Sequence, residues 1–479
     1  MRLKNPFSRT LRHLLSQYGF TKSTTLHKKQ ALQVQSSISS TLWPNVISAS
    51  AFKRMVKSLN KLFKAIAVAV FFAVLIGFVA FVSFNAPDNG GKNFPFFQNS
   101  NRSSSSPLFA ENPRFPEDAK VRDLSFTAGD NYVKTLGRTV FENGVRWFSM
   151  SGSGIEFLCD GDSVTITCRV YNSQYITYNH RPRVVAFVNG EQKDDVVLDG
   201  ESEDITLDLS SYDGDCTVKL VKASEGTYST VGISSISAVA KGDICPSPRG
   251  SLKIEFLGDS ITCGYGLDAG SSGSFSTRTE NFTETYAFLA AKQLGADAAA
   301  VSFSGYGVLT GFPSNGMAND YVIFKHYENS LINCDDISAG QYWSFSGNAN
   351  DLVVINLGTN DASYCYTEDR RNSFVDEYKR LLSLVRLREP GAYILCVLGD
   401  MNNSLYPSIE RAVSEYRDDS YDSRVKCATL SFEMGTYGSV VDGHPTKESN
   451  VLAAETLVNE IKALGILPAG QTESTSTVW

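Results

Sequence analysis

Residues 252–262 read LKIEFLGDSIT, an apolar run followed at once by a polar turn that contains a glycine. Four later runs share its length and apolar character, at 298–303, 352–357, 392–397 and 425–430. Short apolar runs bounded by turn residues are typical of buried strands. These five runs therefore predict the strands of one sheet in residues 250–468.

Stretches with helical character separate these runs, at 283–294, 374–388 and 446–464. Gly295 and Gly465 directly follow two of them, and glycine is favoured just beyond the C-terminus of a helix. Strands that alternate with helices predict an α/β domain with a five-stranded parallel sheet, covered by helices on both faces. In such sheets the reactive groups lie at the carboxyl ends of the strands.

Residues 123–246 show a different pattern, in which apolar and polar residues alternate with a period of two. The clearest runs are 164–170, 205–209 and 216–221. Asp160-Gly161 and Asn189-Gly190 are turn signals between such runs. This spacing predicts an all-β sandwich of jelly-roll type that precedes the α/β domain.

Residues 65–84 read AIAVAVFFAVLIGFVAFVSF, without a charge. At about 1.5 Å per residue this run spans about 30 Å, the thickness of a bilayer core. Basic residues cluster at 53–64, whereas the first acidic residue is Asp88, so the positive-inside rule predicts a membrane anchor with the later residues outside the cytoplasm. A cleaved signal segment is the alternative, and it exports the same residues.

The remaining segments are expected to be irregular. Residues 1–64 form a basic cytoplasmic tail with weak periodicity, and residues 85–122 form a linker rich in Pro, Gly, Asn and Ser. Residues 469–479 form a C-terminal tail.

Charge and cysteine usage exclude two classes of function. The 479-residue chain has a net charge of −7, but residues 1–87 hold 12 Lys or Arg and no acid, so the rest holds 32 basic and 51 acidic side chains. An acidic surface argues against nucleic acid as a partner. The nine cysteines stand singly, without a C-x-x-C pair, which argues against a zinc ribbon and favours buried thiols, with one or two disulfides left open.

Polar turns follow three of the predicted strands, and a fourth polar turn precedes the last helix. They are GDSIT at 258–262, SGYG at 304–307, GTND at 358–361 and DGHP at 442–445. Each motif alone is weak, but their order and their placement at strand ends make the combination specific.

Ser260 in the first turn is the candidate nucleophile, and a serine hydroxyl needs a base to become reactive. Only His326 and His444 follow residue 250. His444 lies in a Gly/Pro turn directly before the closing helix and is the predicted base. His326 is the alternative, and a purely structural turn histidine at 444 is another.

These four turns resemble the conserved blocks of the SGNH hydrolases, over residues 250–466. The Asp-x-His-Pro motif and Ser-Gly-x-Gly are further similar to carbohydrate esterase family 2, as are residues 137–139 and 147–157 of the β-rich region. The resemblance implies a flavodoxin-like three-layer hydrolase domain, preceded by a jelly-roll domain. It also implies that no metal or organic cofactor is needed.

The resemblance implies an oxyanion hole made by the backbone N–H groups of Ser260 and Gly305 and by the side-chain amide of Asn360. Such donors stabilise the charge that develops on the attacked carbonyl oxygen. Two alternatives stay open, because Gly307 is a competing donor and Asn360 is also a residue that favours helix N-caps.

Two roles are open for Asp442. It is the candidate triad acid, but it lies only two residues before His444, so its carboxylate can point away and leave a backbone carbonyl to orient the imidazole. Asp259 and Asp361 are expected to hold their turns by hydrogen bonds, and Asp361 is also placed at the mouth of the substrate site.

Aromatic rings stack on the apolar faces of sugars, so four aromatic residues in loops are candidate substrate contacts. They are Tyr306, Trp343, Tyr364 and Tyr437. Together with the resemblance, this predicts an extracytoplasmic serine esterase that removes O-acetyl groups from acetylxylan or acetylated glucomannan. The alternatives are an esterase for cell-envelope glycans or lipids, and an inert carbohydrate-binding surface protein.

Overall fold

The computed structural model describes residues 114–116, 118–334, 336–337 and 342–468. The predicted basic tail, the membrane segment, most of the linker and the C-terminal tail lie outside these residues. Within the described ranges, no helix has both the length and the apolar character needed to cross a membrane.

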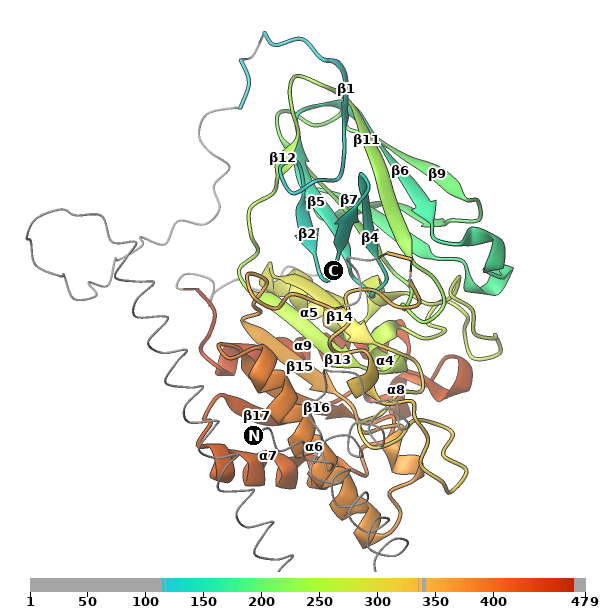
Figure 1. Ribbon diagram of the computed structural model, residues 1–479, viewed down its shortest axis with the longest axis vertical. Helices are drawn as coiled ribbons and strands as arrows, with labels where there is room; N and C mark the ends of the chain where they lie inside the picture. Colours follow the sequence, from blue (N-terminus) through green and yellow to red (C-terminus); the bar gives the residue numbers. More distant parts are fainter. Residues whose placement is uncertain (1–113, 117, 335, 338–341, 469–479) are drawn as a thin grey trace, which may run out of the picture. The chain divides into compact units, whose positions relative to one another are not determined.

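The first part of the described chain is built from two six-stranded antiparallel sheets (Figure 1). One sheet has the order β3-β4-β11-β6-β9 with β1 on β11, and the other has the order β12-β5-β10-β7-β8 with β2 on β5. The strands are β1 Arg122–Phe126, β2 Lys134–Leu136, β3 Val140–Glu142, β4 Val145–Phe148, β5 Gly154–Cys159, β6 Gly161–Val170, β7 Arg183–Val188, β8 Glu191–Val197, β9 Ser202–Asp208, β10 Cys216–Lys222, β11 Val231–Ala240 and β12 Cys245–Pro246.

The period-two pattern explains this part. In β6, Val164, Ile166 and Cys168 are fully buried, whereas the residues between them are partly exposed. Apolar side chains of both sheets meet in one core, to which β5 and β10 also contribute. The expected turn at Asn189-Gly190 joins β7 to β8. The alternation therefore buries one face of each sheet against the other.

The second part contains a five-stranded parallel sheet, as predicted. Its strands are β13 Lys253–Gly258, β14 Asp297–Ser302, β15 Leu352–Asn356, β16 Tyr393–Gly399 and β17 Val425–Leu430. Their spatial order is β14-β13-β15-β16-β17, so the chain reverses direction across the sheet between β13 and β15. Ligands of such sheets bind at this reversal, outside the carboxyl ends of the strands.

Helices cover both faces of this sheet. The α-helices are α4 Ser260–Cys263, α5 Tyr286–Leu294, α6 Glu368–Arg388, α7 Tyr406–Ser420, α8 Met434–Tyr437 and α9 Lys447–Ala463. Side chains of α5 and α9 pack on one face, and side chains of α6 and α7 pack on the other. Short 3-10 turns lie at η1 Ser173–Tyr175, η2 Tyr178–His180, η3 Phe282–Glu284, η4 Ile323–Lys325, η6 Asp361–Ser363 and η7 Val441–Gly443.

Helix α7 is absent from the sequence prediction although its signal is present. Ile409, Ala412, Val413 and Tyr416 are buried at spacings of three and four residues, which is the pattern of one helix face. The many charged residues between them hide this stripe in a reading that looks for apolar runs.

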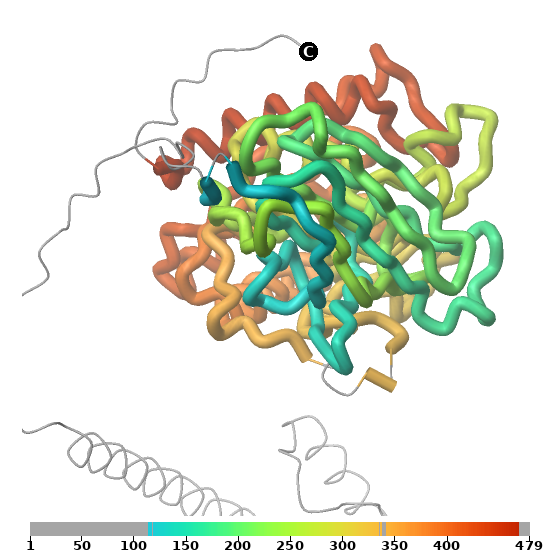
Figure 2. Tube along the Cα trace, turned by 90° about the horizontal axis from the view of Figure 1, so that it is seen from above, coloured from blue at the N-terminus to red at the C-terminus, as the bar shows by residue number. Residues whose placement is uncertain are grey.

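The β-sandwich packs against the α/β domain. In Figure 2, which views the molecule from above, the cyan and green trace of the sandwich lies in front of the yellow and orange trace of the α/β domain. Buried contacts join the two parts, such as the ion pair between Arg138 and Glu255 of β13. No disulfide bond joins cysteines within the described residues, and seven of the nine cysteines are buried.

Candidate active site

Ser260 and His444 meet although 184 residues separate them. Ser260 begins α4 directly after β13, and His444 follows the short turn η7. The Nε2 atom of His444 lies 2.7 Å from the Oγ atom of Ser260. Both side chains are buried to more than nine-tenths, with 7% and 8% of their surfaces exposed. The predicted nucleophile and base are therefore in hydrogen-bond contact.

The other imidazole nitrogen fixes the tautomer. Nδ1 of His444 lies 3.2 Å from the backbone carbonyl oxygen of Val441. A carbonyl can only accept, so Nδ1 carries the proton and Nε2 is left to accept from the Ser260 hydroxyl. Burial lowers the pKa of His444, and the Val441 carbonyl and the Asp442 charge oppose that shift only in part. The imidazole is thus held neutral, as a base must be.

The Asp442 side chain does not orient His444, and its prediction as the triad acid is corrected here. Its carboxylate accepts a hydrogen bond from the Tyr265 hydroxyl at 2.9 Å. The backbone of Asp442 is left-handed, with φ of 53°, and the carbonyl of the preceding Val441 takes the place at Nδ1. The second reading of the sequence, a backbone carbonyl as the orienting group, describes this geometry.

Tyr265 is a site residue that the sequence did not reveal. Its ring stacks on the His444 imidazole, with centroids 4.4 Å apart and an angle of 26° between the planes. On its other side it stacks on Phe275 at 4.1 Å. Tyr265 therefore limits the ring positions open to the base. An aromatic residue five positions after the nucleophile gives no signal of this contact.

The side chain of Asn360 joins the first three turns. Its Nδ2 atom donates to the backbone carbonyl of Tyr306 at 2.8 Å and to Oδ2 of Asp259 at 3.3 Å. Asn360 directly precedes the turn η6, but its side chain makes no capping hydrogen bond there. The alternative role as an N-cap is thus not the one observed. The amide instead lies beside Asp259, the residue that directly precedes the nucleophile Ser260.

Asp259 holds the nucleophile turn, as expected. Its Oδ1 atom accepts from the backbone N–H of Ile261 at 3.0 Å, and the residue is 1% exposed. Burial raises the pKa of Asp259 to about 7, against the effect of the Ile261 hydrogen bond. Near neutral pH this carboxyl is only partly ionised, which makes it a weak acceptor for the second amide hydrogen of Asn360.

The loop after β14 leaves one backbone donor free. Gly307 donates its N–H to the carbonyl of Tyr321 at 3.0 Å, so it is not the oxyanion donor that the sequence left open. Ser304 and Tyr306 also use theirs. Within the described residues the N–H of Gly305 has no partner. Its φ of 80° is a conformation that glycine adopts without strain.

The two parts of the chain match two families. Residues 135–248 match the carbohydrate esterase 2 N-terminal family, and residues 256–426 match the GDSL-like lipase/acylhydrolase family. Both matches fall on the parts just described, and the second match includes Ser260, Gly305 and Asn360 and ends before His444. The chain has an SGNH hydrolase domain, preceded by the N-terminal domain of carbohydrate esterase family 2.

Two curated proteins are similar to this SGNH hydrolase over most of its described residues. The cellulase/esterase CelE of Acetivibrio thermocellus is 30% identical over 318 residues, which are 65% of this chain and 37% of CelE. An acetylxylan esterase/glucomannan deacetylase of Cellvibrio japonicus is 24% identical, over 71% of this chain and 91% of that protein.

A family two carbohydrate esterase from Clostridium thermocellum, solved in complex with cellohexaose, is 28% identical. Its TM-score is 0.61, and the match covers 70% of this chain and all of that one. The shared architecture therefore extends over both described parts of the hydrolase.

Two of the predicted substrate contacts of the hydrolase are wrong. Asp361 is fully buried, and its carboxylate accepts the backbone N–H groups of residues 308–310 at 2.7–3.1 Å. Trp343 lines a cavity of about 970 Å³ together with Lys253, Asp297 and Tyr393. These residues begin β13, β14 and β16, so Trp343 lies at the amino edge of the sheet, opposite Ser260.

The other three aromatic residues stay predictions. The carbonyl of Tyr306 holds Asn360, and its hydroxyl lies 3.3 Å from Nε2 of His326. That contact also places His326 with Tyr306 rather than with the nucleophile. Tyr364 stacks under Arg370 at 4.0 Å, and Tyr437 on α8 is 44% exposed.

Proposed function

We propose that this chain is a serine esterase that removes O-acetyl groups from acetylated plant cell-wall polysaccharides, such as acetylxylan or glucomannan. The observation that carries the proposal is the 2.7 Å contact between Ser260 Oγ and His444 Nε2, with Nδ1 tied to the Val441 carbonyl. This is the arrangement that activates a serine for acyl transfer.

In the first half-reaction, Ser260 Oγ attacks the acetyl carbonyl carbon while His444 Nε2 takes the hydroxyl proton. The carbonyl oxygen becomes an oxyanion, which the free N–H of Gly305 and the N–H of Ser260 can stabilise. Asn360 contributes by exchanging its long 3.3 Å contact with Asp259 for the oxyanion, while the Tyr306 carbonyl keeps its other amide hydrogen.

The bond to the sugar oxygen then breaks, and His444 returns its proton to that oxygen, which leaves as a hydroxyl group. In the second half-reaction His444 takes a proton from water, the water oxygen attacks the acetyl-serine, and acetate and free Ser260 are formed. One water is consumed for each acetyl group released.

The polysaccharide substrate is supported by the names of the relatives, which include an acetylxylan esterase/glucomannan deacetylase. Because the chain spans only 37% of the length of CelE, the activity of that whole protein does not carry over. An extracytoplasmic location rests on the uncharged apolar run at 65–84, which the structure does not describe. In a cell fractionation experiment, we expect the full-length chain in the membrane fraction and a chain of residues 85–479 in the soluble fraction.

The test of function is acetate release by wild type, Ser260→Ala and Ser383→Ala on acetylated xylan, acetylated glucomannan, acetylated peptidoglycan and a long-chain ester. Ser383 is an exposed serine on α6 and is the matched control. We expect Ser260→Ala to lose at least about 10⁴-fold in kcat and Ser383→Ala to match wild type.

Equal rates for Ser260→Ala and wild type would reject the proposed nucleophile. A preference for acetylated peptidoglycan or for the long-chain ester would instead favour the alternative of an esterase for cell-envelope glycans or lipids. Glycan binding without any acetate release would instead identify an inert binding protein.

A further inference from the structure

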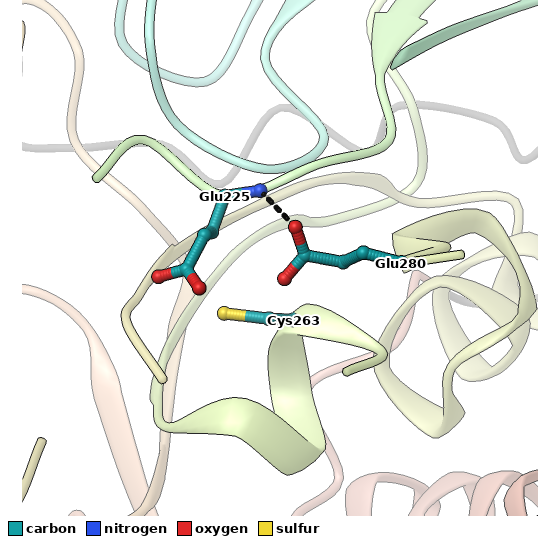
Figure 3. A group of neighbouring side chains, drawn as sticks. All are labelled: Glu225, Cys263 and Glu280. Carbon is teal, nitrogen blue, oxygen red and sulfur yellow. Dashed lines mark hydrogen bonds between the residues drawn. The ribbon is translucent and has the colours of Figure 1, made fainter. Parts of the chain in front are cut away.

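The loop that joins β10 to β11, residues 223–230, reaches from the β-sandwich into the α/β domain. The carbonyl of Ala223 accepts from the N–H of Phe282 at 2.8 Å. The N–H of Glu225 donates to Oε2 of Glu280 at 2.9 Å, as Figure 3 shows. The loop is therefore fixed to the segment that follows α4 and does not stand apart from the catalytic domain.

The Glu225 side chain extends this connection to the oxyanion loop. Its Oε2 atom accepts the backbone N–H of Ser304 at 2.9 Å and the hydroxyl of Thr227 at 3.0 Å. Glu225 is 1% exposed, so water does not compete for these hydrogen bonds. Ser304 directly precedes Gly305, whose free N–H is the predicted oxyanion donor.

The direction of the Gly305 N–H depends on the peptide unit between Ser304 and Gly305. The hydrogen bond to Glu225 fixes Ser304 at the start of this unit. On the far side, the Gly305 carbonyl accepts from the N–H of Phe312 at 2.8 Å. Hydrogen bonds on both sides thus hold a glycine that could otherwise rotate freely.

The position of this carboxylate is energetically expensive. The Oε1 atoms of Glu225 and Glu280 are buried and have no hydrogen-bond partner within the described residues. One carboxylate oxygen of Glu225, one carboxylate oxygen of Glu280 and Sγ of Cys263 on α4 lie within 4.8 Å of one another (Figure 3). Burial raises the pKa of both carboxyl groups.

Lys222 supplies the compensating charge. Its ammonium group is fully buried and donates to the carbonyls of Ser224 and Glu225 at 2.7 Å each. Its positive charge acts on both carboxylates. Burial of a carboxylate costs desolvation free energy even when a positive charge compensates it. Apolar side chains would join two domains without this cost, so the carboxylate points to a role beyond joining them.

We propose that Glu225 is a positioning residue for catalysis, through which the β-sandwich sets the orientation of the Gly305 N–H in the oxyanion hole. The inference rests on the proposed esterase function. It makes the N-terminal domain a part of the catalytic apparatus and not only a structural neighbour of the hydrolase domain.

The test compares Glu225→Met, Glu225→Gln and the control Asn333→Gly in the full chain, with 4-nitrophenyl acetate and acetylated xylan. Methionine keeps the length of the side chain but removes the acceptor, whereas glutamine keeps one acceptor oxygen for the Ser304 N–H. Asn333 donates to the Thr227 carbonyl at 3.1 Å, so its loss removes an interdomain hydrogen bond of the same loop without touching Ser304. Glycine tolerates the φ of 56° at this position.

We expect Glu225→Met to lose about 10- to 100-fold in kcat with KM within about twofold of wild type, because a misplaced oxyanion donor weakens only the transition state. Glu225→Gln should restore most of kcat, and Asn333→Gly should match wild type. Unfolding curves of all variants show which assay temperatures keep them folded.

A wild-type kcat in folded Glu225→Met would overturn the inference, and so would an equal loss in Glu225→Gln and Glu225→Met. If Glu225→Met does not fold, Thr227→Val replaces it, since this variant removes the hydroxyl that holds the carboxylate. A lower kcat of Thr227→Val at unchanged KM would support the inference, and an unchanged kcat of this variant would overturn it. Failure of the proposed function is distinct, because it appears as equal activity of wild type and Ser260→Ala.

Discussion

At the scale of single residues, the base is set by its immediate contacts. His444 has its proton fixed at Nδ1 by the Val441 carbonyl, and the ring of Tyr265 covers one of its faces. A carbonyl is a neutral acceptor, so it orients the imidazole but stabilises the imidazolium less than a carboxylate does. Asp442 makes no hydrogen bond to His444 and acts on it through its charge and through its hydrogen bond to Tyr265.

The first prediction at this scale concerns pH. Burial lowers the pKa of His444, and the protonated ring cannot accept the Ser260 proton. Activity should therefore be full above this pKa and fall as the pH drops through it. We expect the acid limb of kcat/KM to have its midpoint below the ordinary histidine value of about 6.5. A midpoint above that value would contradict the neutral, buried base.

Asp442→Asn separates charge from orientation. Loss of the negative charge should move the acid limb to lower pH, because that charge raises the His444 pKa. The kcat on the plateau should stay within about threefold of wild type, whereas loss of a true triad acid costs about 10⁴-fold. Tyr265→Phe is the comparison variant, since it removes the same hydrogen bond but keeps the charge, and its acid limb should not move in that direction. A loss of 10³-fold or more in Asp442→Asn would restore Asp442 as the triad acid.

At the scale of elements, the turns that follow β14 and β15 support each other. Asp361, after β15, accepts the N–H groups of Val308, Leu309 and Thr310 in the loop after β14. Gly307 lies against this arrangement, where a Cβ atom would approach the Thr310 carbonyl oxygen to 2.1 Å. The oxyanion loop thus owes its shape to an acid that substrate does not reach.

Asp361→Ala should destabilise the protein. It leaves three buried N–H groups without acceptors, and each such group costs about 1–3 kcal/mol, so we expect a loss of about 3 kcal/mol or more in the free energy of unfolding. Urea unfolding followed by circular dichroism measures it. The control is Asp320→Ala in the same loop, an acid with 92% of its side chain exposed, which should stay within about 0.5 kcal/mol of wild type. Similar values for both variants would disprove the structural role of Asp361.

At the scale of the whole molecule, a buried ion pair connects the sandwich to strand β13 of the parallel sheet. Arg138 is 1% exposed, and its guanidinium contacts both carboxylate oxygens of Glu255 at 2.9 and 3.1 Å. It also donates to the carbonyls of Tyr327 and Asn329. The hydrogen bonds of its guanidinium group are therefore all made to groups of the other domain.

Arg138→Met should cost about 3–5 kcal/mol in the free energy of unfolding, because it leaves the Glu255 carboxylate buried without its partner. Arg249→Met is the matched control. Arg249 forms an ion pair with Asp351, but 58% of the Arg249 side chain is exposed. Loss of this ion pair should therefore cost about 1 kcal/mol or less in the free energy of unfolding. Chemical unfolding of the three proteins measures the difference. Equal stability of Arg138→Met and wild type would show that the domains do not depend on this contact.

Local sequence by itself determined the architecture and the reacting pair. Apolar runs and period-two alternation predicted the five-stranded sheet and the β-rich part, because burial of one or both strand faces imposes these patterns on neighbouring residues. Ser260, Asn360 and His444 could be found because parallel strands bring their carboxyl ends to one edge, so polar turns that are far apart in the chain must converge there.

Tertiary structure alone decided which atoms of those turns do the work. The left-handed backbone at Asp442 directs its carboxylate to Tyr265. The N–H of Gly307 donates to the carbonyl of Tyr321, and Trp343 lies at the edge of the sheet opposite Ser260. Glu225 reaches Ser304 from another domain, 79 residues away. A sequence pattern records how often a residue faces the core, whereas the direction of one N–H or one carboxylate depends on packing between segments that no local periodicity describes.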